Sequence, residues 1–436
     1  MIRFVLAAAL SVASLPAFAA VDVQEVTSPG GIDAWLVEEP SIPFTALEIR
    51  FSPGAALDRA GKRGSVNLMA GLLEEGTGDL DAQGFAAARD ALAASFRYNA
   101  YDDAVSVSAR FLTENRDEAV DLLRRSLVEP SFPEDAVTRV KDQVLSAIAS
   151  DATDPNAIAQ QSFDALAFGD HPYAVPVEGT AETAASLTRE DVVQAHRDTL
   201  VKDNLYVAAV GDITAEDLGT LLDDLLGDLP QSSDVAQPGD AGWNIDPGVE
   251  VVRYDTPQSV VVFGHEGIER DDPDFFAAYV ANEIFGGSGF NSRLMEEVRV
   301  KRGLTYGIGT YLAPMEYAEY VGGRAASANS SVGELVDVVQ AEWGNVAVGI
   351  TAEELDEAKT YLTGAYPLRF DGNANIASIL VGMQMDRLPT SYIDTRNDNI
   401  EAVSLDDIRR VAARIYRPED LSFVVVGQPE GLGEDG

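Results

Sequence analysis

Arg299 and Tyr306 are the side chains whose types and spacing most suggest chemistry, seven positions apart in the second half of the chain. Both groups donate hydrogen bonds, and the guanidinium keeps its positive charge at any physiological pH. Two such donors could bind a peptide carbonyl and stabilise the charge that develops on its oxygen. The structural alternative is that Arg299 interacts with the C-terminal end of a helix and that Tyr306 is an ordinary strand aromatic.

The element expected to position this pair is a short amphipathic helix with Leu294 and Val298 on one face. This helix should end at Gly303 and lead into a strand that begins near Leu304. A glycine-rich turn precedes the helix. Because glycines tolerate unusual backbone angles, the turn could flex and contact a substrate, although it could also be only a turn. The glycines concerned are Gly286, Gly287 and Gly289.

The composition excludes several classes of protein. The chain has 436 residues, 46% of them apolar, and is therefore long enough for two or three domains with real cores. Its net charge of −41 repels phosphate backbones and makes nucleic acid a poor partner. We interpret the acidity as a solvated surface suited to a salty environment; attraction of basic peptides is the alternative. The absence of cysteine from the sequence excludes disulfides, thiol catalysis and cysteine zinc sites.

The first 19 residues are typical of a secretory signal peptide. Arg3 precedes the apolar run from Phe4 to Val12, and Ala17-Phe18-Ala19 matches a cleavage site. An uncleaved membrane anchor is the alternative, but the apolar run is shorter than the roughly 20 residues needed to span a membrane, and Pro16 interrupts it. We therefore expect a mature chain that starts near Ala20, is periplasmic or secreted, and has no stable membrane insertion.

Apolar periodicity predicts strands and helices in mixed order, and hence an α+β fold. In the first half the predicted strands are residues 31–38, 45–51, 95–101, 104–112 and 205–210. The predicted helices are residues 65–75, 82–93, 114–127, 133–150, 155–168 and 188–200, with another from Thr214.

The second half repeats the order of the first. Lys141, late in one helix, has a counterpart in Lys359, and the segment from Leu187 to Val192 has a counterpart that starts at Leu405. A strand that ends in glycine also recurs, at Gly211 and at Gly427. Three matches at nearly the same separation favour two homologous domains of about 210 residues each. Residues 230–247 between them are rich in Gly, Pro, Ser and Asp, as is typical of a linker.

These features resemble the insulinase-type (M16) zinc peptidases over nearly the whole mature chain. The residues that carry the resemblance are the His171-Pro172-Tyr173 turn, the strand from Asn204 to Asp212, and above all Ser292-Arg293-Leu294 through Gly303-Leu304-Thr305-Tyr306. The resemblance implies two M16-type domains, each a mainly antiparallel sheet packed with helices. Their expected ranges are residues 20–229 and 248–430, with an acidic tail, expected to be disordered, at residues 431–436.

The zinc motif of this family, His-x-x-Glu-His, is absent from its expected place. The segment before Gly76-Thr77, where the family carries the motif, contains Asn67, Ala70 and Gly71 at the three motif positions. Neither histidine nor the glutamate base is present, and residues 143–150 contain no glutamate that could be the downstream ligand. The sequence therefore predicts that this chain binds no metal and does not hydrolyse peptides by itself.

No other metal site is indicated. The three histidines, His171, His196 and His265, are never paired on one helix turn, and each is expected in a turn or at the surface. Glu74 and Glu75 stand beside the lost motif and are expected to be solvated.

The resemblance implies a role for the pair that remains. In the family, an arginine and a tyrosine at the positions of Arg299 and Tyr306 face the zinc site and bind the substrate backbone. In its heterodimers, a chain without the metal motif supplies them to a zinc-bearing partner. The expectation is therefore a non-catalytic, substrate-binding subunit that acts on peptides together with a zinc-bearing M16 homologue. The alternative is a non-enzymatic scaffold or peptide-binding protein with the same fold.

Overall fold

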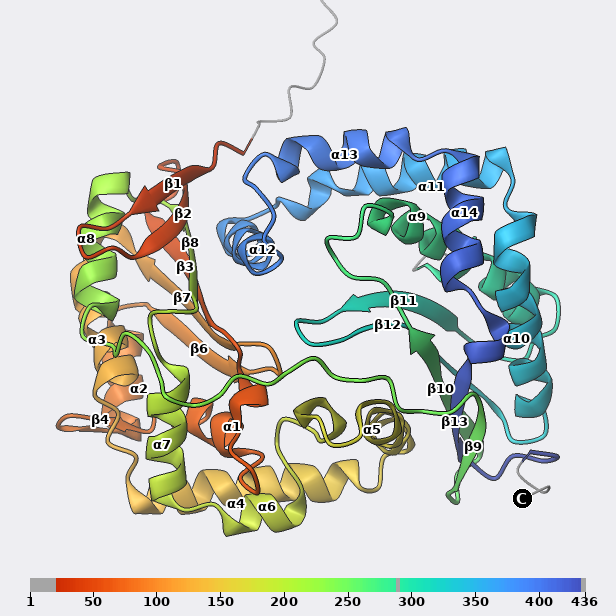
Figure 1. Ribbon diagram of the computed structural model, residues 1–436. Helices are drawn as coiled ribbons and strands as arrows, with labels where there is room; N and C mark the ends of the chain where they lie inside the picture. Colours follow the sequence, from red (N-terminus) through yellow and green to blue (C-terminus); the bar gives the residue numbers. More distant parts are fainter. Residues whose placement is uncertain (1–20, 288–290, 433–436) are drawn as a thin grey trace, which may run out of the picture.

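The computed structural model describes residues 21–287 and 291–432, so the predicted signal peptide and Gly289 lie outside the described residues. Its two large sheets lie in the two halves of the chain, with helices packed around both (Figure 1). The fold is therefore α+β, as the sequence predicts. No helix within residues 21–287 and 291–432 is both long and apolar enough to cross a membrane.

The first half contains a six-stranded sheet in the order β1-β2-β8-β3-β7-β6. All its neighbouring strands are antiparallel except β2 and β8. Its strands are β1 (Gln24–Thr27), β2 (Asp33–Glu38), β3 (Phe44–Phe51), β6 (Ser95–Ala100), β7 (Val105–Leu112) and β8 (Leu205–Gly211), beside a small hairpin of β4 (Gly76–Thr77) and β5 (Leu80–Asp81). Its helices are α1 (Ser65–Ala70), α2 (Ala82–Ala91), α3 (Arg116–Val128), α4 (Glu134–Asp151), α5 (Pro155–Phe168), α6 (Ala181–Ser186), α7 (Arg189–Thr199) and α8 (Ala215–Leu226).

The second half contains a five-stranded sheet in the order β11-β12-β10-β13-β9, again with one parallel pair, β13 and β9. Its strands are β9 (Gly248–Arg253), β10 (Gln258–Glu266), β11 (Ile308–Pro314), β12 (Glu319–Ala328) and β13 (Ser422–Gly427). Its helices are α9 (Phe275–Gly286), a π-helix (Met295–Val300), α10 (Val332–Gly349), α11 (Ala352–Ala365), α12 (Asn373–Met385), α13 (Tyr392–Ala402) and α14 (Leu405–Ile415).

The two sheets correspond strand by strand, because β2-β8-β3-β7-β6 and β9-β13-β10-β12-β11 have the same order and the same parallel pair. The two lysines that correspond in the sequence repeat, Lys141 and Lys359, also make equivalent hydrogen bonds. The Lys141 ammonium donates to the carbonyl of Leu187 at 3.0 Å, and the Lys359 ammonium donates to the carbonyl of Glu401 at 2.7 Å. Each lysine therefore joins its helix to the backbone just before the helix α7 or α14. Residues 230–247 form no helix or strand.

One helix from each half packs on the sheet of the other half (Figure 1). Helix α5 of the first half packs on β10 and β13, and α12 of the second half packs on β8 and β3. These contacts form two hydrophobic clusters that contain residues from both halves. The two halves therefore share buried surface rather than being joined by residues 230–247 alone.

The tips of two hairpins also meet between the halves. The Tyr173 hydroxyl donates to the Asp103 carboxylate at the β6–β7 turn. The backbone N–H of Glu316, at the β11–β12 turn, donates to the same carboxylate at 3.2 Å, and the N–H of Tyr317 donates to the Tyr173 hydroxyl at 3.2 Å. Burial raises the pKa of Asp103, and these donors oppose that shift.

Most element boundaries agree with the sequence prediction, but two near the candidate sites do not. The helix predicted over residues 65–75 ends at Ala70, and tighter bonds from the N–H of Leu72 to the carbonyl of Met69 follow it. The strand predicted from Leu304 begins at Ile308. The first two residues of the predicted tail, Gly431 and Leu432, are described, and Leu432 packs against the core of the second half.

Candidate functional site

The degenerate zinc-motif positions lie at the end of α1 in the first half. Asn67 is half-buried, Ala70 is 2% exposed, and Gly71 caps the helix. A Cβ atom at position 71 would lie 3.4 Å from Val140 on α4, so α1 faces the helix on which the downstream ligand was expected. Amide, methyl and hydrogen side chains cannot replace imidazole and carboxylate, so these residues do not fit zinc. Among residues 21–287 and 291–432 no group of three His, Cys, Asp or Glu could hold a metal ion.

The two glutamates beside α1 both pair with arginines; the Glu74 side chain stays 43% exposed, whereas Glu75 is 15% exposed, so the expectation of a solvated carboxylate was wrong for Glu75. Glu74 accepts a hydrogen bond from Arg89 at 2.8 Å, and Glu75 pairs with Arg139 of α4. Burial raises the pKa of Glu74, and the Arg89 charge opposes that shift. These carboxylates are therefore committed to structural ion pairs.

His265 is a core residue and His196 is half-buried on a helix, contrary to the expectation of a turn or surface position. His265 is 1% exposed; its Nε2 accepts from the Trp343 indole at 2.9 Å, and its Nδ1 lies 2.6 Å from the Glu266 carbonyl. His196 lies 2.7 Å from the carbonyl of Leu127. Burial lowers the pKa of both rings, which favours neutral imidazoles. His171 is a turn histidine as predicted, since its Nδ1 accepts from the N–H of Tyr173.

Arg299 lies in a π-helix, an arrangement that is rare and often found at functional sites. Leu294 and Val298 are fully buried beside it, so the predicted apolar face is confirmed. The Arg299 side chain is half-buried. Gly303 has φ of +65°, a conformation that favours glycine, and its N–H bonds the Arg299 carbonyl at 2.9 Å. The backbone at Arg299 is therefore fixed by the turn that ends the π-helix.

Tyr306 projects from a turn that the flanking threonine holds in place. The Thr305 hydroxyl donates to the carbonyls of Gly307 at 2.8 Å and of Ala326 on β12 at 2.7 Å. The hydroxyl of Ser327 holds the carbonyl of Leu304 at 2.6 Å. These side-chain bonds replace strand pairing, which is why β11 begins only at Ile308. Tyr306 itself is 86% exposed, so it is not the packed strand aromatic of the structural alternative.

A groove of about 700 Å³ opens beside this turn, between α5 of the first half and the sheet of the second half. Its floor consists mainly of small or apolar residues on β10, β11 and β12, and one cationic side chain, Arg324, stands in it. Arg324 is exposed and forms no ion pair within 4.0 Å with a carboxylate of the described residues. The residues that line the groove include Asn156, Gln160, Val260, Val262, Gly307, Gly309, Tyr311 and Arg324.

The sequence prediction missed this groove. Its two walls come from opposite halves of the chain, and periodicity does not show which helix covers which sheet. One signal was present: Arg324 interrupts the run of small residues from Gly322 to Ala326, a cation in a strand that otherwise has little side-chain bulk. The strand β12 therefore carries one positive charge, on Arg324, among residues whose small side chains leave room for a ligand.

The glycines before the π-helix have packing roles as well as a place at the groove. Gly286 lines the groove, and a Cβ there would lie 2.2 Å from the Thr310 hydroxyl. A Cβ at Gly287 would lie 2.3 Å from the Glu283 carboxylate. Both positions therefore require glycine for close approach, whether or not they contact a substrate.

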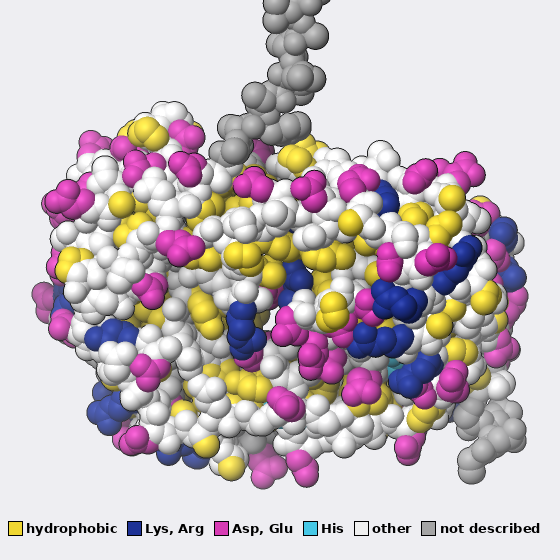
Figure 2. All heavy atoms as spheres, turned by 45° about the horizontal axis from the view of Figure 1, so that its top comes forward, with side chains coloured by type: hydrophobic (Ala, Val, Ile, Leu, Met, Phe, Trp, Pro, Cys, Tyr) yellow, Lys and Arg dark blue, Asp and Glu magenta, His cyan; other side chains and the backbone are white. Residues whose placement is uncertain are grey.

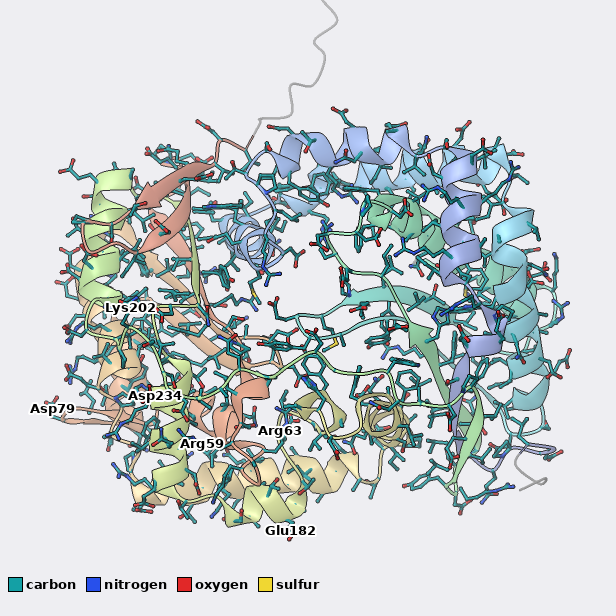
Figure 3. All side chains as sticks on the ribbon, viewed as in Figure 1. Arg59, Arg63, Asp79, Glu182, Lys202 and Asp234 are labelled. Atoms are coloured by element: carbon teal, nitrogen blue, oxygen red, sulfur yellow. The ribbon has the colours of Figure 1, made fainter. Side chains whose placement is uncertain are left out.

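The surface charge is dispersed. Figure 2 shows acidic side chains over the whole of the face drawn, while hydrophobic side chains gather along its middle. Asp79, at the outer end of the β4–β5 hairpin and well away from the interior in Figure 3, pairs with Arg125 at 2.8 Å. This pattern suits a solvated acidic surface better than one focused binding patch.

Comparison with known proteins agrees with this fold. A sequence profile described as "Peptidase M16 inactive domain" matches residues 186–362. A non-peptidase homologue of Helicobacter pylori, YmxG, is 28% identical over 89% of this chain and 90% of its own. An uncharacterised zinc protease of Streptomyces coelicolor, SCO5738, is 26% identical over 92% of this chain and 89% of its own.

Solved structures give the same result. The M16 inactive domain structure from Pseudomonas fluorescens superposes with a TM-score of 0.86 and 27% identity, covering 94% of this chain and 98% of its own. A structure described as a protease from Helicobacter pylori has a TM-score of 0.84 at 17% identity, over 93% of this chain and 100% of its own, a likeness of fold alone. These comparisons show that the fold, with its two large sheets, is that of the M16 inactive-domain structures. By these comparisons the chain is similar to the M16 peptidases and their non-peptidase homologues, and its sequence lacks the His-x-x-Glu-His motif.

Proposed function

We propose that this chain is the substrate-binding, metal-free subunit of a two-chain M16 peptidase. In this role Arg299 and Tyr306 act on a peptide held at the zinc site of a partner chain, an M16 homologue that carries the motif. This chain supplies two hydrogen-bond donors for substrate carbonyls, and the partner supplies the metal chemistry. The assembly is a heterodimer or a larger complex.

The exposure of Tyr306 is the observation that carries the proposal. An 86% exposed tyrosine contributes little to the core, yet the Thr305 and Ser327 hydroxyls hold the turn that presents it with one partly buried and one buried hydrogen bond. A donor fixed in advance stabilises a developing oxyanion without reorganisation cost. The groove beside Gly307 gives an extended peptide a place to lie against the same turn. The side chains at Asn67, Ala70 and Gly71 leave this chain without a hydrolytic centre of the family type.

Reconstitution tests the proposal. The mature chain is mixed with a zinc-bearing M16 homologue, and cleavage of a quenched fluorescent peptide is followed. Arg299→Ala or Tyr306→Phe should each lower kcat of the mixture by about 100-fold, the usual loss when one oxyanion donor is removed. The matched control is Arg197→Ala, which changes an exposed residue on another helix.

Each variant is also checked by thermal unfolding, because an exposed tyrosine should not change Tm. Turnover that stays within twofold of the wild type in both site variants would refute the divided site. Metal analysis gives a second test. Stoichiometric zinc in the isolated chain would contradict the claim that its own motif positions hold no metal.

A non-enzymatic scaffold is the second candidate. One relative is named a non-peptidase homologue, which favours this alternative for that protein. Two results together would favour the scaffold over the peptidase subunit. No mixture of this chain with a zinc-bearing homologue would cleave peptides, and a bound peptide would protect the Tyr306 turn from proteolysis.

A further inference from the structure

A second cavity, of about 540 Å³, lies wholly within the second half and has an unusual charge for so acidic a protein. One face of α12, the turn after α11 and the start of α13 form its walls. Three arginines line it against one carboxylate, Asp386. These arginines are Arg270, Arg369 and Arg396.

Arg396 is the central observation. It is only 5% exposed, and its guanidinium donates to the carbonyl of Leu362 at 3.2 Å and to the Asn397 side chain at 3.0 Å. It also lies 4.2 Å from the centre of the Tyr366 ring. No carboxylate of residues 21–287 and 291–432 comes within 4.0 Å of it. A buried charge without a counter-charge is costly, so the site favours an anion.

Tyr366 adds an independent observation. It is 6% exposed, and its hydroxyl is buried without a hydrogen-bond partner among the described residues. Burial raises the pKa of Tyr366 to about 12, so the group is a neutral O–H donor at physiological pH. A buried donor without an acceptor costs free energy, and this one lines the same cavity as Arg396.

The other arginines extend the same charge. Arg270 is half-buried, donates to the Tyr392 hydroxyl at 3.0 Å, and pairs at 3.5 Å with Asp386. Arg369 is exposed and forms no ion pair with a described carboxylate. Asp386 therefore offsets one guanidinium and leaves two without a carboxylate.

We propose that this cavity binds a small multivalent oxyanion of the phosphate or polycarboxylate class. Arg396 and Arg369 neutralise the ligand, and the Tyr366 hydroxyl donates to it. Guanidinium groups present paired donors that match the oxygens of phosphate and carboxylate. The cavity volume is within the range of sites that hold small molecules.

The ligand would also stabilise the contact between the two halves at α12. The residues of α12 that line the cavity include Ser378, Ile379 and Gly382, whereas Leu380 and Val381 pack on β8 of the first half. One helix therefore has the anion cavity on one face and the other half of the molecule on another. The site is separate from the Tyr306 turn, so its test does not depend on the proposed function.

Gly382 allows a test without removing charge. A Cβ at this position meets no atom within 4 Å, so Gly382→Leu should fill the cavity and leave the fold intact. Gly364→Leu is the matched control, because Gly364 is also helical, is exposed, has open space and lies outside the cavity lining. Arg369→Gln is a second site variant that removes one exposed charge.

The experiment measures binding to the full mature chain by calorimetry, together with Tm, at constant ionic strength in buffer without phosphate. The probes are pyrophosphate and citrate. Pyrophosphate or citrate should bind the wild type and Gly364→Leu saturably and raise Tm. Gly382→Leu and Arg369→Gln should each weaken binding by about tenfold or more, as expected for loss of a charge-assisted contact or of the cavity itself.

The two probes identify the ligand class. Binding of pyrophosphate alone assigns a phosphate-type ligand, and binding of citrate alone assigns a polycarboxylate; either result supports the site. Absence of saturable binding by both probes would overturn it. Equal affinity in the wild type, Gly382→Leu and Arg369→Gln would also overturn it, because the anion would then bind elsewhere.

Discussion

Helices α5 and α12 occupy equivalent places, each on the sheet of the opposite half, yet they make different contacts. With the separation that relates Lys141 to Lys359, Phe163 of α5 corresponds to Val381 of α12. Phe163 lies in an aromatic cluster with Trp243 and Tyr320. The buried members of the cluster around Val381 are Ala, Val and Leu, and its aromatic side chains, Trp35 and Tyr206, are only partly buried. The same topology therefore buries large aromatic side chains where α5 packs on the second sheet, and mainly small ones where α12 packs on the first.

The buried arginines differ in the same way. Arg63, just before α1 and above α6 in Figure 3, is 8% exposed and pairs with Asp102 at 2.6 Å. It also donates to the carbonyls of Ala55 and Val175. Arg396 is as deeply buried and has no carboxylate partner among the described residues. The first half thus satisfies its buried charge internally, and the second half leaves it for a ligand.

Replacing each arginine by methionine tests this difference and should give the largest effect. Arg63→Met leaves Asp102 without its counter-charge and should lower the free energy of unfolding by about 4 kcal/mol. Arg396→Met strands no described carboxylate and should lower it by less than about 1 kcal/mol. Urea unfolding in phosphate-free buffer measures both. Equal losses would show that Arg396 is as fully compensated as Arg63.

Truncating the two equivalent side chains at the joints comes next. Phe163 is fully buried, so Phe163→Ala should cost about 3 kcal/mol or somewhat more. Val381→Ala removes only two methyl groups and should cost about 2 kcal/mol. The measurement is again urea unfolding, fitted at each spectroscopic probe. If Val381→Ala is the more damaging variant, the joint at α12 is the stronger one and the comparison of the two joints is reversed.

Asp164 gives α5 a pH dependence that α12 lacks, because Gly382 stands at the equivalent position. Burial raises the pKa of Asp164 to about 7, and a bond from Gln160 opposes that shift while Asp102 adds to it. Between about pH 4 and pH 7 the folded protein keeps a proton that the unfolded chain has released, so the free energy of unfolding falls as pH rises through that window.

Asp164→Asn should remove this fall. Relative to the wild type, the variant should gain about 1–3 kcal/mol above pH 7 and nothing near pH 3.5, since the Gln160 amide can still donate to the Asn oxygen. Urea unfolding across this pH range measures the gain. Gly382→Asn, at the equivalent position, should show no pH-dependent difference from the wild type. A constant difference between Asp164→Asn and the wild type at every pH would contradict the buried-acid interpretation.

The sequence predicted the elements better than their contacts. Helix α5 was predicted over its observed range because local signals mark it: Asp154 caps it and Pro155 occupies its first turn. The start of β11 was wrong, because the Thr305 hydroxyl bonds a carbonyl on β12 that local pattern does not show. The empty zinc motif could be predicted from residue types alone. The anion cavity could not, because Arg396 and Tyr366 come together only when α13 packs beside α11.

The smallest effect concerns the place where the halves are most alike. Lys359→Ala removes an ammonium bond to a backbone carbonyl just before α14. Lys141→Ala removes the equivalent bond before α7, together with a longer one, at 3.5 Å, to the carbonyl of Ala185. These bonds lie partly or wholly in solvent, so each variant should lose only about 0.5–1 kcal/mol of unfolding free energy, and the two losses should agree within error. Urea unfolding of both variants checks this. A loss twice as large for one lysine would show that the two halves share the position of the ammonium group but not its contribution to stability. Helices α5 and α12 likewise share a position but not their contacts.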